Sequence, residues 1–154
     1  MALEIERKFL IKSWPDITSA KRLDIRQGYV LDLFNTVVRV RKSNKDGFLT
    51  IKRSTGKAAL GVNEYEWRIP QWLTSFLLKV SFLGYINKTR YNIDYEGHTF
   101  ELDVFNGKNA GLVVAEVELA NEHEPVKYPS WIGEEVTGQK KYFNKNLAKG
   151  KRNE

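Results

Sequence analysis

Charges spaced two residues apart recur along this chain and constrain its fold more than any other feature. In residues 3–11, Glu4, Glu6 and Lys8 alternate with apolar side chains that are interrupted only by Arg7. Residues at positions i and i+2 of a β-strand share one face, and the residues between them lie on the other. The stretch therefore predicts a strand with one face that needs a hydrophobic core and a second face that concentrates charge.

The same pattern returns in six later stretches, most of which carry two charges of one sign. The charged positions are Arg39, Arg41, Lys52, Glu64, Glu66, Lys88, Arg90, Glu101, Asp103, Glu116 and Glu118. Neighbouring like charges on a strand face repel unless an opposite charge lies between them, and a solvated surface usually mixes both signs. The segregation predicts external counter-charges, cations for the carboxylates and an anion for the lysines and arginines. A charged face in water and internal salt bridges without a ligand are the alternatives.

Length and composition describe an ordinary globular chain. Its 154 residues are enough for one domain with a real core, and 42% of them are hydrophobic. Because the start is charged at once, we expect no signal peptide, and no apolar run approaches the roughly 18 residues that span a bilayer. Because cysteine is absent, any metal must be held by oxygen or by the two histidines. We expect a single domain over residues 1–154, in the cytoplasm, with no membrane partner.

The net charge of +6 suggests nucleic-acid binding until it is located. Residues 140–154 contain six lysines and arginines against Glu154 alone, which accounts for +5 of the total. The rest of the chain is therefore close to neutral. We expect a basic C-terminal helix and tail at about 138–154 with solvated charges, and the sequence disfavours a nucleic-acid partner.

Alternation and turn residues predict a mainly antiparallel β-structure. Residues 44–47 end in Asp-Gly, which suits a hairpin turn, and Pro70 is suited to begin a helix over 71–78. A final amphipathic stretch at 141–147 predicts a second helix. Strands are expected at residues 3–11, 26–31, 36–43, 48–53, 62–69, 86–95, 99–105 and 111–120.

A sheet of seven or eight such strands could curl until its charged face encloses a lumen, which removes exposed sheet edges. The apolar faces would then point outwards and need covers. The available covers are the helix after Pro70, the C-terminal helix and a second subunit. An open sheet with its charged face in water is the alternative, and the composition leaves both open.

The motifs also carry a resemblance to a known family. The run Glu4-Ile5-Glu6-Arg7-Lys8 resembles the ExExK signature of the CYTH superfamily, or triphosphate tunnel metalloenzymes, which includes class IV adenylate cyclases, thiamine triphosphatases and inorganic triphosphatases. Later stretches resemble the family's further motifs in the same order, so the match spans essentially the whole chain. They include residues 27–29, 38–41, 50–52, 64–66, 88–91, 101–105, 115–118, 134–137 and 142–144. Where many relatives have an acidic residue followed by Arg, this chain has Gln139 and Lys141.

The resemblance implies an α+β, mainly β fold, in which an eight-stranded antiparallel closed barrel with a few covering helices forms a tunnel, often in a homodimer. The tunnel would bind a triphosphate with Mg²⁺ or Mn²⁺. Lys8, Arg39, Arg41, Lys52, Lys88 and Arg90 would hold phosphate oxygens, and Glu4, Glu6, Glu116 and Glu118 would hold the metal. Second-rank candidates, as metal ligands or as groups that orient the basic side chains, are Glu64, Glu66, Glu101 and Asp103. Glu4, Glu6, Lys8 and Tyr29 are the expected catalytic residues.

Among the activities of the family, the sequence favours metal-dependent hydrolysis of inorganic triphosphate to pyrophosphate and phosphate. The chain is short, lacks an obvious base-binding insertion and is charged all round the expected lumen. An adenylate cyclase and a nucleoside or thiamine triphosphatase are the alternatives within the family. An alternative of another class is a non-catalytic module that binds polyphosphate or RNA. The binding affinity of such a module should fall steeply as salt is added, whereas a metal-dependent tunnel should lose its function when a chelator is added.

Overall fold

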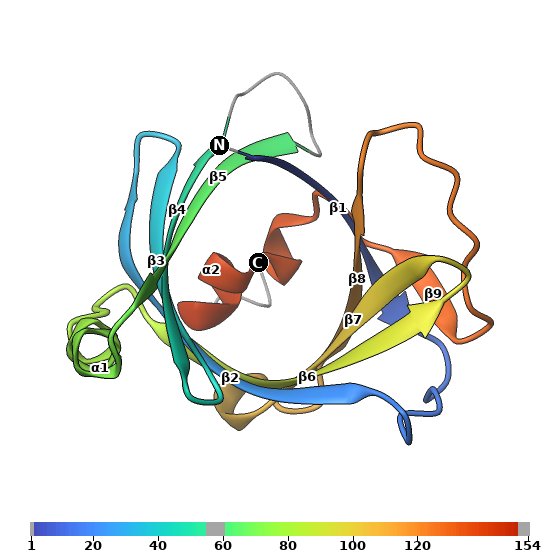
Figure 1. The fold of residues 1–154 in the computed structure, drawn as a ribbon, viewed down its shortest axis with the longest axis horizontal. Coiled ribbons are helices and arrows are strands. Elements are labelled where there is room, and N and C mark those ends of the chain that lie inside the picture. Colours follow the sequence, from blue (N-terminus) through green and yellow to red (C-terminus); the bar gives the residue numbers. More distant parts are fainter. Residues whose placement is uncertain (1, 55–60, 151–154) are drawn as a thin grey trace.

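The structure, a computed structural model, describes residues 2–54 and 61–150. Eight of its strands close into an antiparallel barrel, which confirms the predicted architecture (Figure 1). Around the ring the order is β1-β5-β4-β3-β2-β6-β7-β8, and β8 pairs with β1 to complete it. The bounds are β1 (Ala2–Ile11), β2 (Lys21–Leu33), β3 (Thr36–Ser43), β4 (Asp46–Ser54), β5 (Gly61–Ile69), β6 (Tyr85–Tyr95), β7 (His98–Phe105) and β8 (Val113–Leu119).

Strand β1 closes the ring and uses both of its edges to do so. One edge pairs with β8 from Ile5 to Leu10. The other edge pairs with β5 up to Ile5 and then, from Phe9 onwards, with a ninth strand, β9 (Ile132–Glu135). The sequence pattern did not predict β9, which lies outside the ring.

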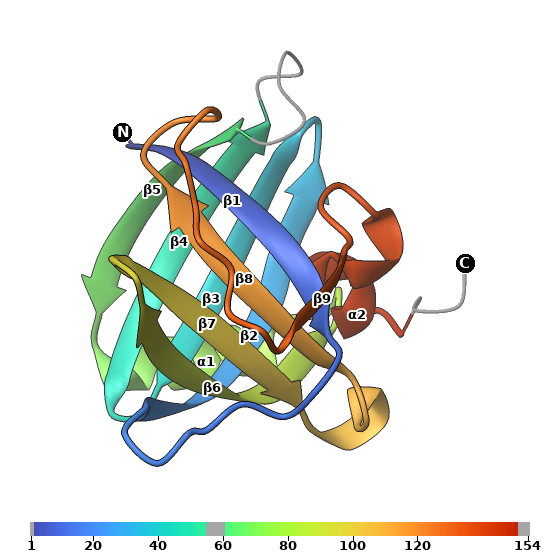
Figure 2. The same ribbon diagram turned by 90° about the vertical axis from the view of Figure 1, so that its right-hand side faces the viewer.

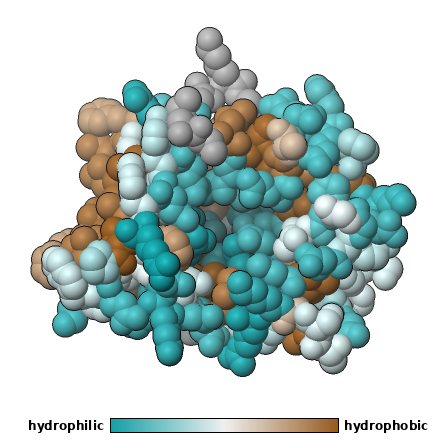
Figure 3. Space-filling model, viewed as in Figure 1, coloured by the Kyte–Doolittle hydropathy of each residue, from teal (hydrophilic) through white to brown (hydrophobic). Residues whose placement is uncertain are grey.

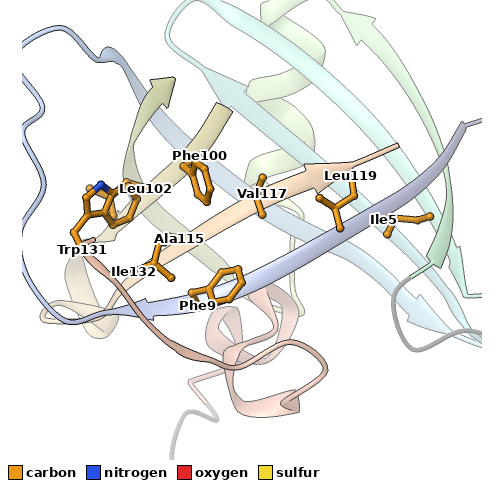
Figure 4. Close-up of a cluster of buried hydrophobic side chains, with 9 residues drawn as sticks. All are labelled: Ile5, Phe9, Phe100, Leu102, Ala115, Val117, Leu119, Trp131 and Ile132. Atoms are coloured by element: carbon orange, nitrogen blue, oxygen red, sulfur yellow. The ribbon is translucent and has the colours of Figure 1, made fainter. Parts of the chain in front are cut away.

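A hydrophobic core covers the outside of β1, β7 and β8. Figure 4 shows nine of its side chains, among them Phe9, Phe100 and Trp131. Val126 and Tyr128, from the segment after β8, pack against the same cluster. The polar sequence of this segment had suggested only turns, yet its few apolar residues cover the outward face that the strand alternation predicted.

Helix α1 (Gln71–Lys79) follows Pro70 as predicted and covers the outside of β2, β3 and β4. Two glycines permit this close approach. A Cβ atom at Gly28 would lie 2.3 Å from the Ser81 Oγ, and one at Gly47 would lie 1.9 Å from the Thr74 Oγ1. The helix and the turn that follows it therefore dock where two positions on the barrel surface carry no side chain.

The C-terminal segment closes one end of the barrel (Figure 2). It forms a 3-10 turn (Lys140–Tyr142) and the short helix α2 (Asn144–Ala148). We expected this helix to cover the outer face, and that expectation is wrong. At this end the lumen is lined by apolar side chains such as Ile86 and Val114, and Leu147 and Ala148 pack against them. Residues 151–154 of the predicted basic tail lie outside the described residues.

Other boundaries differ modestly from the sequence prediction. Strand β2 begins at Lys21 rather than at residue 26, because residues 21–25 pair with β6 despite their polar sequence. A 3-10 turn (Gly107–Asn109) precedes β8, which begins at Val113 rather than at residue 111. None of the helices in the described ranges is long and apolar enough to cross a membrane.

Candidate active site

The lumen holds nearly all of the charged side chains that the sequence singled out. Figure 3 looks into its open mouth, where hydrophilic residues surround a deep hollow. A cavity of about 390 Å³ lies inside and reaches the C-terminal segment. Its lining includes Glu4, Glu6, Lys8, Tyr29, Arg39, Lys52, Thr137, Gly138, Phe143, Asn144 and Lys145.

One charge cluster joins strands β6 and β7. Both carboxylate oxygens of Asp103 are engaged: Lys88 Nζ lies 2.5 Å from Oδ2, and Arg90 donates to Oδ1 at 2.6 Å and to Oδ2 at 2.8 Å. Arg90 also bonds Glu101. The Asp103 side chain is 0% exposed and that of Lys88 1%. Burial lowers the pKa of Lys88. Burial would raise the pKa of Asp103, but the positive charges of Arg90 and Lys88 outweigh this effect and lower it.

The same cluster reaches β1 through Glu116. Its Oε1 lies 2.9 Å from Lys8 Nζ, and its Oε2 lies 3.5 Å from Arg90 Nη2. The charge of Glu116 raises the pKa of Lys8, and the charges of Lys8, Lys88 and Arg90 lower the pKa of Glu116. Burial acts against each of these two shifts but is outweighed. These side chains hold their charges by mutual pairing inside the barrel.

A second cluster joins β1 to β3, β4 and β5. Lys52 Nζ lies between Glu4, at 2.6 Å, and Glu64, at 2.9 Å. Arg41 pairs with Glu66 at 3.1 Å, and Arg39 donates to the Thr50 hydroxyl at 3.3 Å. The contacts of this second cluster are Lys52–Glu4, Lys52–Glu64, Arg41–Glu66, Arg39–Glu66, Arg39–Thr50 and Thr50–Glu66.

Two arginines of this cluster keep a donor unused. The Nε atoms of Arg39 and Arg41 are buried, and neither has a hydrogen-bond partner within the described residues. A buried donor without a partner is costly, because it has lost water and gained nothing in return. An anionic oxygen in the lumen would satisfy both atoms, and arginine is well suited to phosphate geometry.

The two carboxylates of β1 that face the lumen, Glu4 and Glu6, have raised pKa values. Burial raises the pKa of Glu4 to about 7, against the effect of Lys52. The charge of Glu116, followed by burial, raises the pKa of Glu6. Although burial opposes it, the hydrogen bond from Glu4 and the charge of Lys52 lower the pKa of Glu64 to about 2. Glu4 therefore keeps its proton to a higher pH than Glu64 does, and positive charge beside Glu4 and Glu6 would lower the pKa of both.

The predicted metal ligands offer carboxylate oxygen, which hard divalent cations prefer. Glu116 is the main cause of the raised pKa of Glu6, and such a cation would reduce the repulsion between the two carboxylates. Glu118 is exposed and stands opposite Glu6 in the β1–β8 register, so it is the one predicted residue outside the two clusters and the cavity lining. In the described part of the chain no three acidic or histidine groups already converge. The donor chemistry fits a metal, and of these carboxylates Glu4 and Glu116 are paired with lysine or arginine.

Tyr29 has a partner that sequence reasoning missed. The Gln27 side chain, 1% exposed, donates from Nε2 to the Tyr29 hydroxyl oxygen at 2.8 Å. The tyrosine proton therefore remains free for a ligand in the cavity. The signal was present, because Gln27 stands two residues before Tyr29 on the same strand face. Asn144 falls within residues 142–144, which resemble a motif of the family, but no signal pointed to Lys145.

Comparisons with known proteins find relatives that match nearly the whole chain. The CYTH domain model matches residues 2–150. The chain is 43% identical to the inorganic triphosphatase of Acetivibrio thermocellus over 97% of this chain and 95% of that one. It is 37% identical to the inorganic triphosphatase of Nitrosomonas europaea over 94% and 96%. The crystal structure of the inorganic triphosphatase NE1496 superposes with a TM-score of 0.70 at 35% identity, covering 97% of this chain and 96% of that one.

Proposed function

The chain belongs to the CYTH family, and on that premise we propose that it hydrolyses inorganic triphosphate to pyrophosphate and phosphate inside its tunnel. The names of two relatives that match nearly the whole chain support this activity. The observation that carries the proposal is the pair of buried Nε atoms of Arg39 and Arg41, which lack partners among the described residues of a lumen rich in positive charge. These two donors suit a multiply charged phosphate chain.

In this proposal the basic side chains bind phosphate oxygens along the substrate. The arginines offer two-point contacts, and the lysines act as point charges. The set is Lys8, Arg39, Arg41, Lys52, Lys88 and Arg90. Tyr29 donates its free proton to a phosphate oxygen. Because pyrophosphate leaves with additional negative charge, these same cations stabilise the leaving group.

Hydrolysis breaks the bond between the terminal phosphorus and its bridging oxygen. A water oxygen forms the new bond to phosphorus, and the water proton passes to a carboxylate. Glu4 and Glu6 are the candidates for this acceptor, since both line the cavity from β1.

We propose Mg²⁺ or Mn²⁺ as the metal, held by Glu4, Glu6, Glu116 and Glu118. When bound, such a cation neutralises phosphate charge and acidifies the attacking water. Glu64, Glu66, Glu101 and Asp103 would orient the basic residues. This division is supported by their pairing with Lys52, Arg41, Arg90 and Lys88 in the two clusters.

We further propose a homodimer that works in the cytoplasm. Exposed aromatic side chains on β5 and α1 support a self-association surface. They are Tyr65, Trp67, Trp72 and Phe76. Light scattering of the purified protein tests the dimer, and fractionation of cells tests the location.

Phosphate release from inorganic triphosphate, ATP and thiamine triphosphate, with Mg²⁺, Mn²⁺ or EDTA, tests the activity. We expect rapid cleavage of inorganic triphosphate that EDTA abolishes. Formation of cyclic AMP from ATP would instead indicate a cyclase. Binding of triphosphate or RNA without any turnover would contradict the proposed enzyme.

A matched pair of variants connects the activity to the lumen. Lys52 and Arg53 are neighbouring cations on opposite faces of β4, and only Lys52 lines the cavity. We expect Lys52→Ala to lose most of the activity and Arg53→Ala to keep it. Equal activity in the two variants would place the reaction outside the tunnel.

A further inference from the structure

Arg7 is the one charge in the apolar outer stripe of β1, and the proposed mechanism gives it no role. It stands between Glu6 and Lys8 in the sequence, but its side chain lies on the outer face of the barrel. The guanidinium holds Glu135 of β9 at two points, with Nε 2.8 Å from Oε1 and Nη2 2.5 Å from Oε2. Its Nη1 donates to the Tyr128 hydroxyl. These contacts hold the guanidinium in one orientation, which a charge that is merely solvated would not need.

The contact continues back to β1 through Thr137. The Thr137 hydroxyl donates to Glu135 Oε1 at 2.8 Å, and the backbone N–H of Lys8 donates to Thr137 Oγ1 at 2.9 Å. The chain of contacts therefore runs from Arg7 to Glu135, to Thr137 and back to Lys8, the next residue of the same strand. We call these four residues the Arg7 ring.

The Arg7 ring lies where β1 needs support. On this edge β1 pairs with β5 up to Ile5, and it meets β9 only at Phe9, after which the register shifts. Between these points the described contacts on this edge come from the backbone N–H of Val136 to the Lys8 carbonyl, at 2.8 Å, and from Thr137. This unpaired interval carries Glu6 and Lys8, two of the residues on which the proposed reaction depends.

The same ring also fixes part of the cavity wall. Thr137 and Gly138 line the cavity together with Glu6 and Lys8. The exposed fraction of the Arg7 side chain is 32% and that of Glu135 is 38%, and an ordinary surface pair of this kind contributes little. Here the two-point contact and the stacking of Arg7 over the Phe9 and Tyr128 rings, at 5.6 and 5.4 Å, restrict its geometry.

We propose that Arg7 is a positioning residue which, through Glu135 and Thr137, fixes the backbone of Lys8 and the adjoining wall against the bound triphosphate. This inference rests on the proposed function. Arg7 itself does not touch the substrate. It acts from the outer face of the strand whose inner face carries the reaction.

The test compares Arg7→Gln, Glu135→Gln and the double variant by steady-state hydrolysis of inorganic triphosphate, well below their melting temperatures. We expect each single variant to lower kcat/KM roughly tenfold, with a higher KM, because small displacements of a binding group are costly. The double variant should be no worse than the poorer single one, since both interrupt one chain of contacts. Lower melting temperatures with unchanged kcat and KM would show a merely structural role and overturn the proposal.

Lys127→Gln is the control. It removes the exposed Lys127–Glu96 pair, which joins the segment before β9 to the β6–β7 turn, and should leave the kinetics unchanged. Hydrogen exchange separates this inference from the proposed function. If the wild-type protein cleaves no triphosphate, the function fails, but faster exchange of the Lys8 and Val136 amides in Arg7→Gln would still support the ring. Unchanged exchange at both amides would overturn it.

Discussion

At the scale of single residues, Asp103 explains how the lumen tolerates its concentration of positive charge. Its carboxylate is fully buried, and Lys88 and Arg90 use both of its oxygens. Three contacts, at 2.5, 2.6 and 2.8 Å, already occupy these two oxygens. We therefore expect Asp103 to orient the two cations rather than to bind metal.

Asp103→Asn should strongly destabilise the protein, because two buried cations would lose their shared counter-charge. Removing one partner of a buried ion pair typically costs about 3–5 kcal/mol. Glu101→Gln is the matched comparison, since Glu101 contacts the same Arg90 but is 37% exposed, and we expect a loss below about 1 kcal/mol. Urea unfolding measures both. Similar losses in the two variants would contradict this account of Asp103.

Glu4 should make the stability of the metal-free protein depend on pH. Its folded pKa of about 7 lies above its ordinary value of 4.5, so the folded state holds this proton more tightly. The contribution is fully present below pH 4.5 and is lost as the pH rises through 7. As the pH rises from 5 to 8 in the presence of EDTA, the free energy of unfolding of the wild type should fall relative to that of Glu4→Gln. A constant difference across this range would disprove the raised pKa.

At the scale of elements, alternation was enough to predict the barrel strands and the face that each turns inwards. The exceptions have a common cause. Strand β9 has four residues and forms because β1 offers a free edge beyond β5, which no local pattern reports. Residues 21–25 pair with β6 although their sequence alternates poorly. Long-range pairing decides both cases.

In the candidate site too, local spacing predicted which residues take part, and long-range strand pairing decided their partners. Spacing on the strands was enough to choose Lys8, Glu116 and their counterparts, and the structure places them in one lumen. The partner of each charge depends on strand register, so the sharing of Asp103 by Lys88 and Arg90 could not be read from the sequence. The roles of these residues in catalysis remain predictions.

Helix α2 should depend on Asp32 for its position over the end of the barrel. Lys145 and Lys149 bind this carboxylate at 3.1 and 2.8 Å. Asp32→Asn should speed hydrogen exchange of the Leu147 amide and leave the Val117 amide of β8 unchanged. Asp94→Asn, which alters an exposed contact with Thr99, is the control.

Acid should have the same effect on α2. Although burial opposes it, the hydrogen bonds from Lys149 and Lys145 lower the pKa of Asp32 below its ordinary value of 3.8. The stabilisation is therefore present above pH 3.8 and is lost as the pH falls through the folded pKa. Exchange of Leu147 that is insensitive both to this acidification and to Asp32→Asn would show that apolar packing alone holds α2.

At the scale of the whole molecule, most lysines and arginines of the lumen form ion pairs with carboxylates of the same lumen. Substrate phosphates must take lysines and arginines away from their carboxylates, and those carboxylates then favour a cation. Metal and triphosphate should therefore bind cooperatively, each raising the affinity of the other by the same factor.

Thermal unfolding tests this coupling. We expect Mg²⁺ or Mn²⁺ together with triphosphate to raise the melting temperature by more than the sum of their separate effects, because each ligand stabilises the state that the other needs. EDTA should remove the excess, and Lys52→Ala should diminish it while Arg53→Ala retains it. Additive shifts would show that the two ligands bind independently.

The position of β1 in the ring also has a consequence for biosynthesis. The strand that carries Glu4, Glu6 and Lys8 leaves the ribosome before the other strands of the ring, but its long ladder is with β8, which is made after those seven strands. Pairing between distant segments is slow and must await both partners. A nascent chain with all its basic strands in place would still lack the strand that completes the ring. The lumen that would hold the substrate therefore cannot close before the last strand of the ring has been made.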